Sequence, residues 1–358
     1  MRVVSCILLW CLGCAMALAQ NTSPTDPEFI DISIQIFTHR TPAPVAEPKA
    51  ATAPATNASE PVEAVRVAET RYLPMYLRYR LEQSASFGAV RVLPILDNGA
   101  ELRISGEIIN SDGATLAMAI KAQDSTGRVW VDREYTGTAV ASESLNEDAL
   151  AEDPFAQVFT DVVRDLQQQA ALLTAQDRER IKSVSLLRYG LALVPAAFSP
   201  YLEETADGLV TVKRLPANDD PILARILNIR EREYLFIDVV DEEYRTFYDE
   251  VKPVYDLWRR YQREQADTSA VRAARELNTP SDFARGSYRG LQESYNNYRW
   301  AKLQELYVDE LGEGFTNEVE PTQLELDDSV FRLSGSLEQQ YREWRNILAE
   351  LFKLETQQ

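Results

Sequence analysis

The residue types that carry out nucleophilic and metal-dependent chemistry are concentrated at the very start of this chain. All three cysteines lie in the first fourteen residues, at Cys6, Cys11 and Cys14, and the single histidine is His39. Without that first segment, the chain has no Cys/His cluster of the kind that holds a transition metal. His39 is flanked by a threonine and an arginine, and we expect it to be a solvated surface residue. We therefore expect neither a cofactor nor a metal site.

Paired carboxylates are the catalytic chemistry that the composition leaves open. A hydrolase can use two Asp or Glu side chains as general acid and general base. Acidic runs on helix faces and in turns are more often solvated or capping residues, and no nucleophile-elbow, phosphate-loop or dinucleotide motif is present. A carboxylate-dependent hydrolase of a wall or extracellular polymer, with its site between two domains, is therefore the alternative function. The candidate side chains are Asp238, Asp241, Glu242, Glu243, Asp327 and Asp328.

Arginine stands beside tyrosine or tryptophan in three segments of the C-terminal half. One interpretation is that the rings form the core of a helical bundle while the arginines pair with nearby glutamates. The other is a groove or protein-binding face, because Trp, Tyr and Arg dominate the energetics of protein interfaces. The sequence leaves both open. The candidate partner-binding residues are Trp258, Arg259, Tyr261, Tyr298, Trp300, Tyr341 and Trp344.

Residues 1–19 are predicted to be a signal peptide. The segment carries one arginine, an apolar run over residues 6–18, and small residues at Ala17 and Ala19 before Gln20, as signal peptidase requires. Because the remaining chain has no cysteine, we expect export to a bacterial periplasm rather than to a disulfide-forming eukaryotic exterior. The alternatives are lipidation of Cys14, which would tether the protein to a membrane, and an uncleaved anchor. After cleavage or lipidation we expect no transmembrane span in the mature chain.

Net charge restricts the class of partner. The chain has 56 Asp and Glu against 37 Lys and Arg, a net charge of -19. Nucleic-acid binding depends on clustered basic residues, so no nucleic-acid partner is expected. Attraction to anionic lipid headgroups is disfavoured for the same reason.

Hydrophobic periodicity predicts a small α+β domain in the N-terminal half. Residues 20–40 contain an alternating strand, and residues 41–62 form a Pro/Ala-rich linker. Over 63–173, a helix is followed by four strands arranged as a meander and by a second helix. The predicted helices cover 72–84 and the segment after Pro154, and the predicted strands cover 90–95, 102–108, 115–120 and 128–135.

The segment 174–358 is predicted to be a helical domain with a minor hairpin. Its strongest signal is a heptad-like seam of apolar residues from Ile237 to Tyr261 inside a long helix that starts near Pro221. Pro253 should bend that helix. The fold class is therefore α+β, with a small antiparallel sheet and flanking helices followed by a mainly α-helical domain. The other predicted elements are helices at 176–194, 282–311 and after Ser336, a strand at 209–215, and a hairpin formed by 324–326 and 330–333.

Residues 72–94, YLPMYLRYRLEQSASFGAVRVLP, resemble the helix-to-strand step of small periplasmic domains of envelope proteins. These are the TolB N-terminal domain, the curli secretion lipoprotein CsgG and auxiliary lipoproteins of ABC transport systems. The resemblance extends over about residues 29–170, and it departs from the usual pattern at Ser84-Ala85 and in the Pro-rich insert. It implies an accessory or assembly role in the envelope rather than a catalytic site.

The function predicted from the sequence is a non-enzymatic, exported accessory protein that binds another component of the cell envelope in support of assembly or transport. The partner and the oligomeric state are left open.

Overall fold

The computed structural model describes residues 28–40, 60–112, 114–139, 153–217, 219–276, 322–326 and 329–356. Its centre is a mixed sheet in the order β3-β1-β4-β5-β6, with the short β2 beside β4. β1 pairs in parallel with both β3 and β4, while β4, β5 and β6 form an antiparallel meander. The strands are β1 Ile32–Gln35, β2 Thr38–His39, β3 Val90–Leu93, β4 Leu102–Ser111, β5 Thr115–Asp124 and β6 Val129–Thr138.

The expected meander of four consecutive strands is wrong at its first strand, β3, which pairs with β1 and not with β4. β1 lies between β3 and β4, with Ile32 opposite Val90 on one side and Leu102 on the other. The chain returns from β1 to β3 through the helix α1 (Glu60–Gln83), which is the crossover that neighbouring parallel strands require. Three of the four residues of β1 are buried, because a central parallel strand is covered on both faces.

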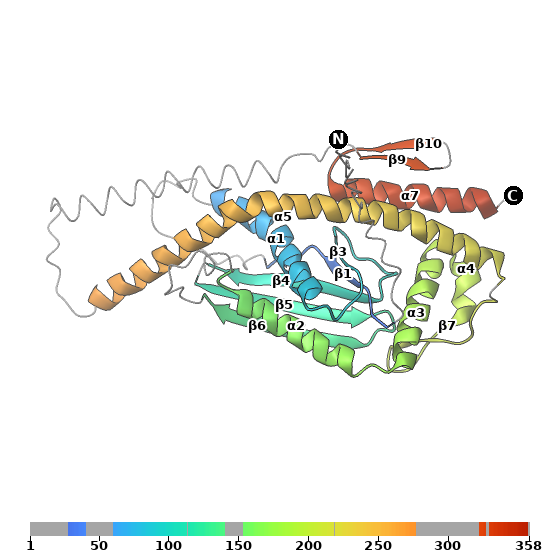
Figure 1. Cartoon of the computed structure of the whole chain (residues 1–358), viewed down its shortest axis with the longest axis horizontal. Helices are drawn as coiled ribbons and strands as arrows, with labels where there is room; N and C mark the ends of the chain where they lie inside the picture. The colour runs from blue at the N-terminus through green and yellow to red at the C-terminus, as the bar shows by residue number, and fades with distance from the viewer. Residues whose placement is uncertain are drawn as a thin grey trace, which may run out of the picture.

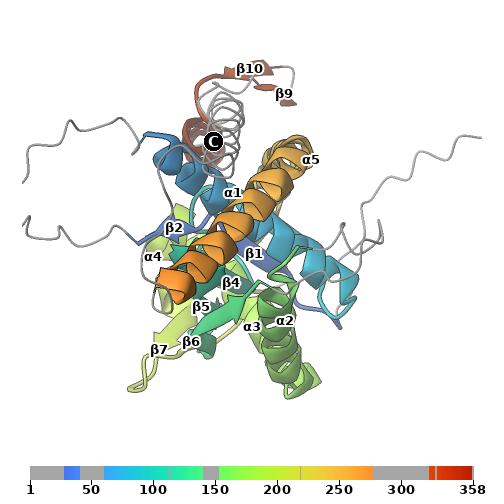
Figure 2. The ribbon, with the colours of Figure 1, turned by 90° about the vertical axis from the view of Figure 1, so that its left-hand side faces the viewer.

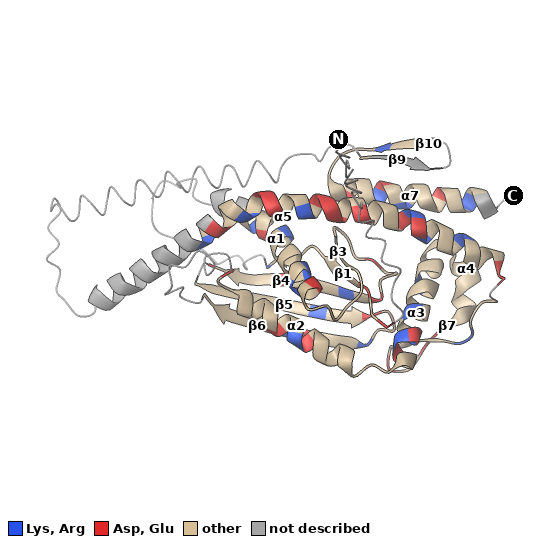
Figure 3. Cartoon of the chain, in the orientation of Figure 1, with Lys and Arg blue, Asp and Glu red and all other residues tan. Residues whose placement is uncertain are grey.

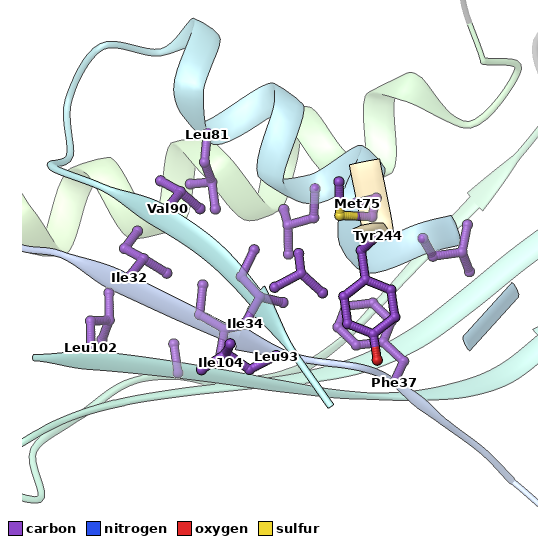
Figure 4. Packing of buried hydrophobic residues seen from close by; sticks show 14 of the residues in the cluster. Ile32, Ile34, Phe37, Met75, Leu81, Val90, Leu93, Leu102, Ile104 and Tyr244 are labelled. Carbon is purple, nitrogen blue, oxygen red and sulfur yellow. The ribbon is translucent and has the colours of Figure 1, made fainter. Parts of the chain in front are cut away.

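Two helices cover one face of this sheet. Figure 1 shows α1 and α2 (Ala156–Ala171) side by side on the same face. α2 turns an apolar stripe inward that includes Phe159, Val162 and Leu166, at the i, i+3, i+7 spacing of an amphipathic helix. In the close view of Figure 4, Leu81 of α1 lies above Val90 and Ile32 of the sheet, and Met75 of α1 lies beside Tyr244 and above Phe37. Burial of these side chains joins the helical layer to the sheet.

The next segment is a helix followed by a small hairpin. α3 (Ala175–Leu193) begins with a capping box between Thr174 and Asp177, which satisfies two free backbone N–H groups at its start. α4 (Pro195–Phe198), a single 3-10 turn and the hairpin β7–β8 come next. The helix expected at 176–194 is confirmed. The strand expected at 209–215 is shorter, Val210–Val212, and it pairs with Leu202–Glu204, which the periodicity did not indicate.

A long helix connects the sheet to the C-terminal elements. α5 (Pro221–Glu276) runs along the edge of the sheet at β3, and α7 (Leu337–Thr356) packs on it. In Figure 2, α5 crosses in front of α1, while α7 and the β9–β10 hairpin lie at the top, away from the sheet. Figure 1 shows α5 changing direction between its yellow and orange parts, the stretch that contains Pro253. β9 is Thr322–Leu326 and β10 is Ser329–Leu333.

The predicted fold class is confirmed: a sheet with flanking helices is followed by a mainly helical region. The predicted hairpin and final helix are also present, and Ser336 caps the latter through Gln339. One hydrophobic cluster contains side chains from the sheet, α1, α2, α3, α5 and α7.

The division into domains at residues 173 and 174 stays a prediction. α1 already begins at Glu60, so residues 60–62 of the expected linker are helical, whereas 41–59 and the helix expected at 282–311 fall outside the described residues. The helices of the described part include none that could span a bilayer.

Candidate functional site

A groove of about 530 Å³ lies between the C-terminal half of α1 and the middle of α5. Its lining combines three tyrosines and a methionine with charged side chains. The groove is a candidate binding site because it joins apolar contact area to convergent polar groups. The lining residues are Met75, Tyr76, Arg78, Tyr79, Arg80, Glu82, Gln83, Arg245, Tyr248, Asp249 and Lys252.

Two of the aromatic side chains of the groove pack against aromatic residues of the core. Tyr76 packs edge-on against Phe159 of α2, with ring centroids 4.7 Å apart. Tyr248 stacks on the fully buried Tyr72, with centroids 4.8 Å apart. Tyr79, by contrast, is 50% exposed. The rings of Tyr76 and Tyr248 are therefore fixed by the core, and the ring of Tyr79 is accessible at the mouth of the groove. Because two of the three rings are already ordered, less side-chain entropy is lost when a partner binds.

Arg78 and Asp241 fix the position of α5 against the sheet. The Arg78 guanidinium lies 3.0 Å from Asp241 Oδ2 and also donates to the backbone oxygen of Val90. Asp241 Oδ1 accepts a hydrogen bond of 2.9 Å from the backbone N–H of Val92. Because β3 is an edge strand, this carboxylate satisfies a donor that no neighbouring strand pairs. Burial raises the pKa of Asp241 to about 6, against the opposing effect of Arg78.

The other carboxylates proposed as a catalytic pair are placed along α5 or outside the described residues. Asp238 is exposed and lies 2.8 Å from Arg91. Glu242 is exposed beside Arg245, at 3.6 Å, and Glu243 is also exposed. Among the described candidates, Asp241 and Asp238 thus each serve in an ion pair that connects α5 to neighbouring elements. Asp327 and Asp328 fall in the part of the chain that is not described.

A buried polar cluster lies deeper between α1 and α5. We call it the Glu69 cluster; it comprises Glu69, Ser111, Tyr255 and Arg259. Ser111 Oγ and the Tyr255 hydroxyl donate to Glu69 Oε1 at 2.5 and 2.8 Å. Arg259 Nε donates to the Tyr255 oxygen at 2.6 Å, and its Nη2 lies 3.5 Å from Glu69. These contacts offset the cost of burying Glu69 and Arg259, each 1% exposed.

His39 lies against this cluster, so its prediction as a solvated surface residue is wrong. Its side chain is 18% exposed, and Nε2 is 3.8 Å from Glu69 Oε2. The pairing of β2 with β4 brings His39 beneath α1. The alternation of the N-terminal strand did not indicate this second short pairing.

The charge of Arg259 also acts on a second buried carboxyl, that of Asp153 just before α2. Its guanidinium lies over the rings of Phe155 and Tyr255, 4.6 and 4.8 Å from their centroids, a favourable cation–π arrangement. Asp153 accepts from the Phe155 backbone N–H at 2.7 Å. Burial raises the pKa of Asp153, while the nearby positive charge of Arg259 opposes that rise. The Glu69 cluster thus connects α1, α2 and α5.

Four of the aromatic and arginine residues proposed for partner binding are interior side chains of the folded chain. Trp258 is 7% exposed, Arg259 and Trp344 are each 1% exposed, and Tyr341 is fully buried. Tyr341 donates to the buried Glu233 at 3.0 Å. These four form core between packed helices rather than a surface. The side chain of Tyr261, together with Tyr298 and Trp300, falls outside the described residues, and their role stays a prediction.

Carboxylates also line a very small cavity beside the N-terminal part of α5. Glu101 Oε2 accepts from the Asp31 backbone N–H at 3.0 Å. Burial raises the pKa of Glu101 to about 7, against the opposing effect of that hydrogen bond. The cavity that they line with Arg230 and Tyr234 has a volume of about 20 Å³, room for about one water molecule.

Sequence reasoning missed the groove residues. The tyrosines of α1 were recognised as a helical pattern, but their spacing did not indicate which ring would be exposed. The groove forms only where α5 crosses α1. Its lining residues Met75 and Tyr248 are 173 positions apart in the chain. Among the described residues, no group of three or more His, Cys, Asp or Glu is arranged to hold a metal ion. The signal peptide and Cys14 fall outside the described residues.

Comparisons with known proteins give two partial structural similarities. No family model and no curated protein matches the sequence. A PelC dodecamer from Paraburkholderia phytofirmans is similar over 40% of this chain and 92% of its own, at 14% identity and a TM-score of 0.23. A protein from Xanthomonas campestris of the family model DUF330 is similar over 44% of this chain and 90% of its own, at 15% identity and a TM-score of 0.21. The resemblance to TolB, CsgG and ABC auxiliary domains stays a prediction.

Proposed function

We propose that this chain is a non-enzymatic, exported accessory protein of the cell envelope that binds another envelope protein. The proposed compartment is the bacterial periplasm, reached through the predicted signal peptide, with lipid anchoring at Cys14 as the alternative. The binding surface is the groove between α1 and α5.

The observation that carries this proposal is the composition of the groove. It places tyrosine and arginine side chains around one hollow of about 530 Å³. Tyr and Arg are enriched among the residues that contribute most to protein–protein binding. Tyr79 and Arg245 are 50% and 59% exposed at its mouth, so a partner can bury both without unfolding either helix.

The hydrolase alternative has less support. Asp238 and Asp241 are held in ion pairs with Arg91 and Arg78. The carboxyl with a pKa near 7, Glu101, lies in a cavity of about 20 Å³, too small for a segment of a polymer. Neither arrangement leaves two carboxyl groups beside a space that admits a glycosidic bond.

Site-specific photocrosslinking in intact cells tests the proposal. A photoreactive phenylalanine analogue replaces Tyr79 in the groove or, as a control, Leu172, which is 74% exposed at the end of α2. The expected result is one crosslinked exported protein from position 79, which competition by uncrosslinked wild-type chain reduces, and none from position 172. The absence of any adduct at position 79, or the same adducts at both positions, contradicts the proposal.

A further inference from the structure

The charge of the groove differs from that of the whole molecule. Four of its eleven lining residues are Arg or Lys and two are Asp or Glu, whereas the chain has 37 basic against 56 acidic residues. Figure 3 shows charges of both signs distributed along α5. The lining of the groove therefore has more basic than acidic residues, within an acidic protein.

The basic residues of the groove differ in their burial and in the contacts that they make with the rest of the fold. Arg78 is 13% exposed and bonds Asp241, Glu82 and the backbone of Val90, so it supports the fold. Arg245 is 59% exposed, and its ion pair with Glu242, which is 67% exposed, spans 3.6 Å. An exposed pair of this kind contributes little free energy. Arg245 can therefore exchange its partner for an incoming carboxylate at small cost.

Three residues of α5 form a regular row along the groove. Arg245, Tyr248 and Lys252 follow the i, i+3, i+7 spacing that keeps side chains on one helix face. Lys252 is 31% exposed and pairs with Asp256 at 2.7 Å. The two cations are separated by seven residues, or about 10 Å along the helix, with an aromatic ring between them. Tyr79 and Tyr76 of α1 form the opposite wall.

We propose that the groove binds an acidic segment of the partner protein, with carboxylates about 10 Å apart and an apolar side chain between them. The inference rests on the proposed function and adds the chemistry of the partner. Arg245 and Lys252 receive the carboxylates, and the apolar side chain packs on Tyr248 and Tyr79. The carboxylates of the segment compete there with Glu242, 3.6 Å from Arg245, and with Asp256, 2.7 Å from Lys252. Screening over about 8 Å at physiological salt reduces repulsion from acidic residues that lie farther away.

Fluorescence anisotropy with the purified mature protein tests this inference. The probe is a short labelled peptide in which Glu alternates with Leu, and the reference is the same peptide with Gln in place of Glu. At physiological salt we expect the Glu peptide to bind about tenfold more tightly than the Gln peptide. The Arg245→Glu variant should abolish that preference.

A matched control separates the groove from general surface charge. Arg342 on α7 is 61% exposed and pairs with Glu338 on its own helix, much as Arg245 pairs with Glu242. Arg342→Glu changes the net charge of the chain equally, so it should leave the preference for the Glu peptide unchanged. Circular dichroism of both variants checks that the fold is intact.

The outcomes distinguish this inference from the proposed function. Equal affinity for the Glu and Gln peptides, or an equal loss with both variants, overturns the acidic-segment inference, even where position 79 crosslinks to a partner. Tighter binding of an anionic polysaccharide such as alginate than of the Glu peptide also overturns it, in favour of a polymer ligand. A peptide preference that depends on Arg245, with no crosslinked partner, supports the inference and contradicts the proposed function.

Discussion

The hydroxyl of Tyr255 on α5 donates a hydrogen bond of 2.8 Å to the carboxylate of Glu69 on α1, 186 positions earlier in the chain. Both side chains are almost completely buried. A buried carboxylate without donors is strongly destabilising, so this contact and the neighbouring Arg259 set where α5 crosses α1. The groove above depends on that crossing, which connects the stability of the fold to the proposed binding site.

Removal of Arg259 should strongly destabilise the protein. In Arg259→Met, the positive charge that faces Glu69 and Asp153 is lost, and we expect a decrease of about 3–5 kcal/mol in the free energy of unfolding. Urea titration followed by circular dichroism measures it. The double variant with Glu69→Gln should lose less than the sum of the two single variants, because the two residues interact directly. Additive losses would show that the pair is not coupled.

Glu101 should make stability depend on pH in a predictable direction. Its pKa is about 7 in the folded chain against 4.5 as the ordinary value. The folded state therefore binds more protons than the unfolded state between these values, and stability falls as pH rises through this window. Glu101→Gln removes the cost of the buried charge. We expect the free energy of unfolding of the variant to exceed that of the wild type by about 1–3 kcal/mol at pH 8 and by little or nothing at pH 4.

Urea titrations of both proteins at several pH values measure the difference, in which the titration of Asp241 and other shared groups cancels. A gain that is the same at pH 4 and at pH 8 would show that the Glu101 carboxyl does not titrate in this window.

Gly106 should not tolerate even a methyl group. It lies on β4, where an added Cβ would come within 2.7 Å of the ring of the buried Phe37. The Phe37 ring is enclosed by core side chains and cannot move freely. Gly106→Ala should therefore lower the free energy of unfolding by about 1–3 kcal/mol. The melting temperature measures the effect, and Ser105→Ala, the neighbouring strand position, is the control. Equal melting temperatures of the two variants would contradict this account of the β2–β4 junction.

Trp344 should act as a core residue rather than as a binding residue. It is 1% exposed and packs against Phe236 and Phe331, with ring centroids 5.9 and 6.0 Å apart. We expect Trp344→Ala to reduce the free energy of unfolding by about 3–5 kcal/mol. Leu354→Ala, on the same helix but 60% exposed, should cost less than about 0.5 kcal/mol. A loss of partner crosslinking by Trp344→Phe with unchanged stability would instead favour a surface role.

Local patterns determined much of the fold. The amphipathic period of α2, the capping residue Ser336, and the turn signals of the β4–β6 meander depend on residues close together in the chain. Such interactions are encoded by residue type and spacing, and the corresponding predictions are confirmed. The seam of α5 also predicted buried positions correctly, including Ile237, Val240 and Tyr244.

The sequence by itself determined the acidic character of the protein, the lack of cysteine beyond residue 14 and the α+β class. Only the tertiary structure decided that β1 inserts between β3 and β4, that His39 meets Glu69, and that Arg259 is interior while Arg245 is exposed. The physical reason is that strand order and side-chain burial arise from contacts between residues far apart in the chain, which no local period records. The groove between α1 and α5 is a product of those contacts.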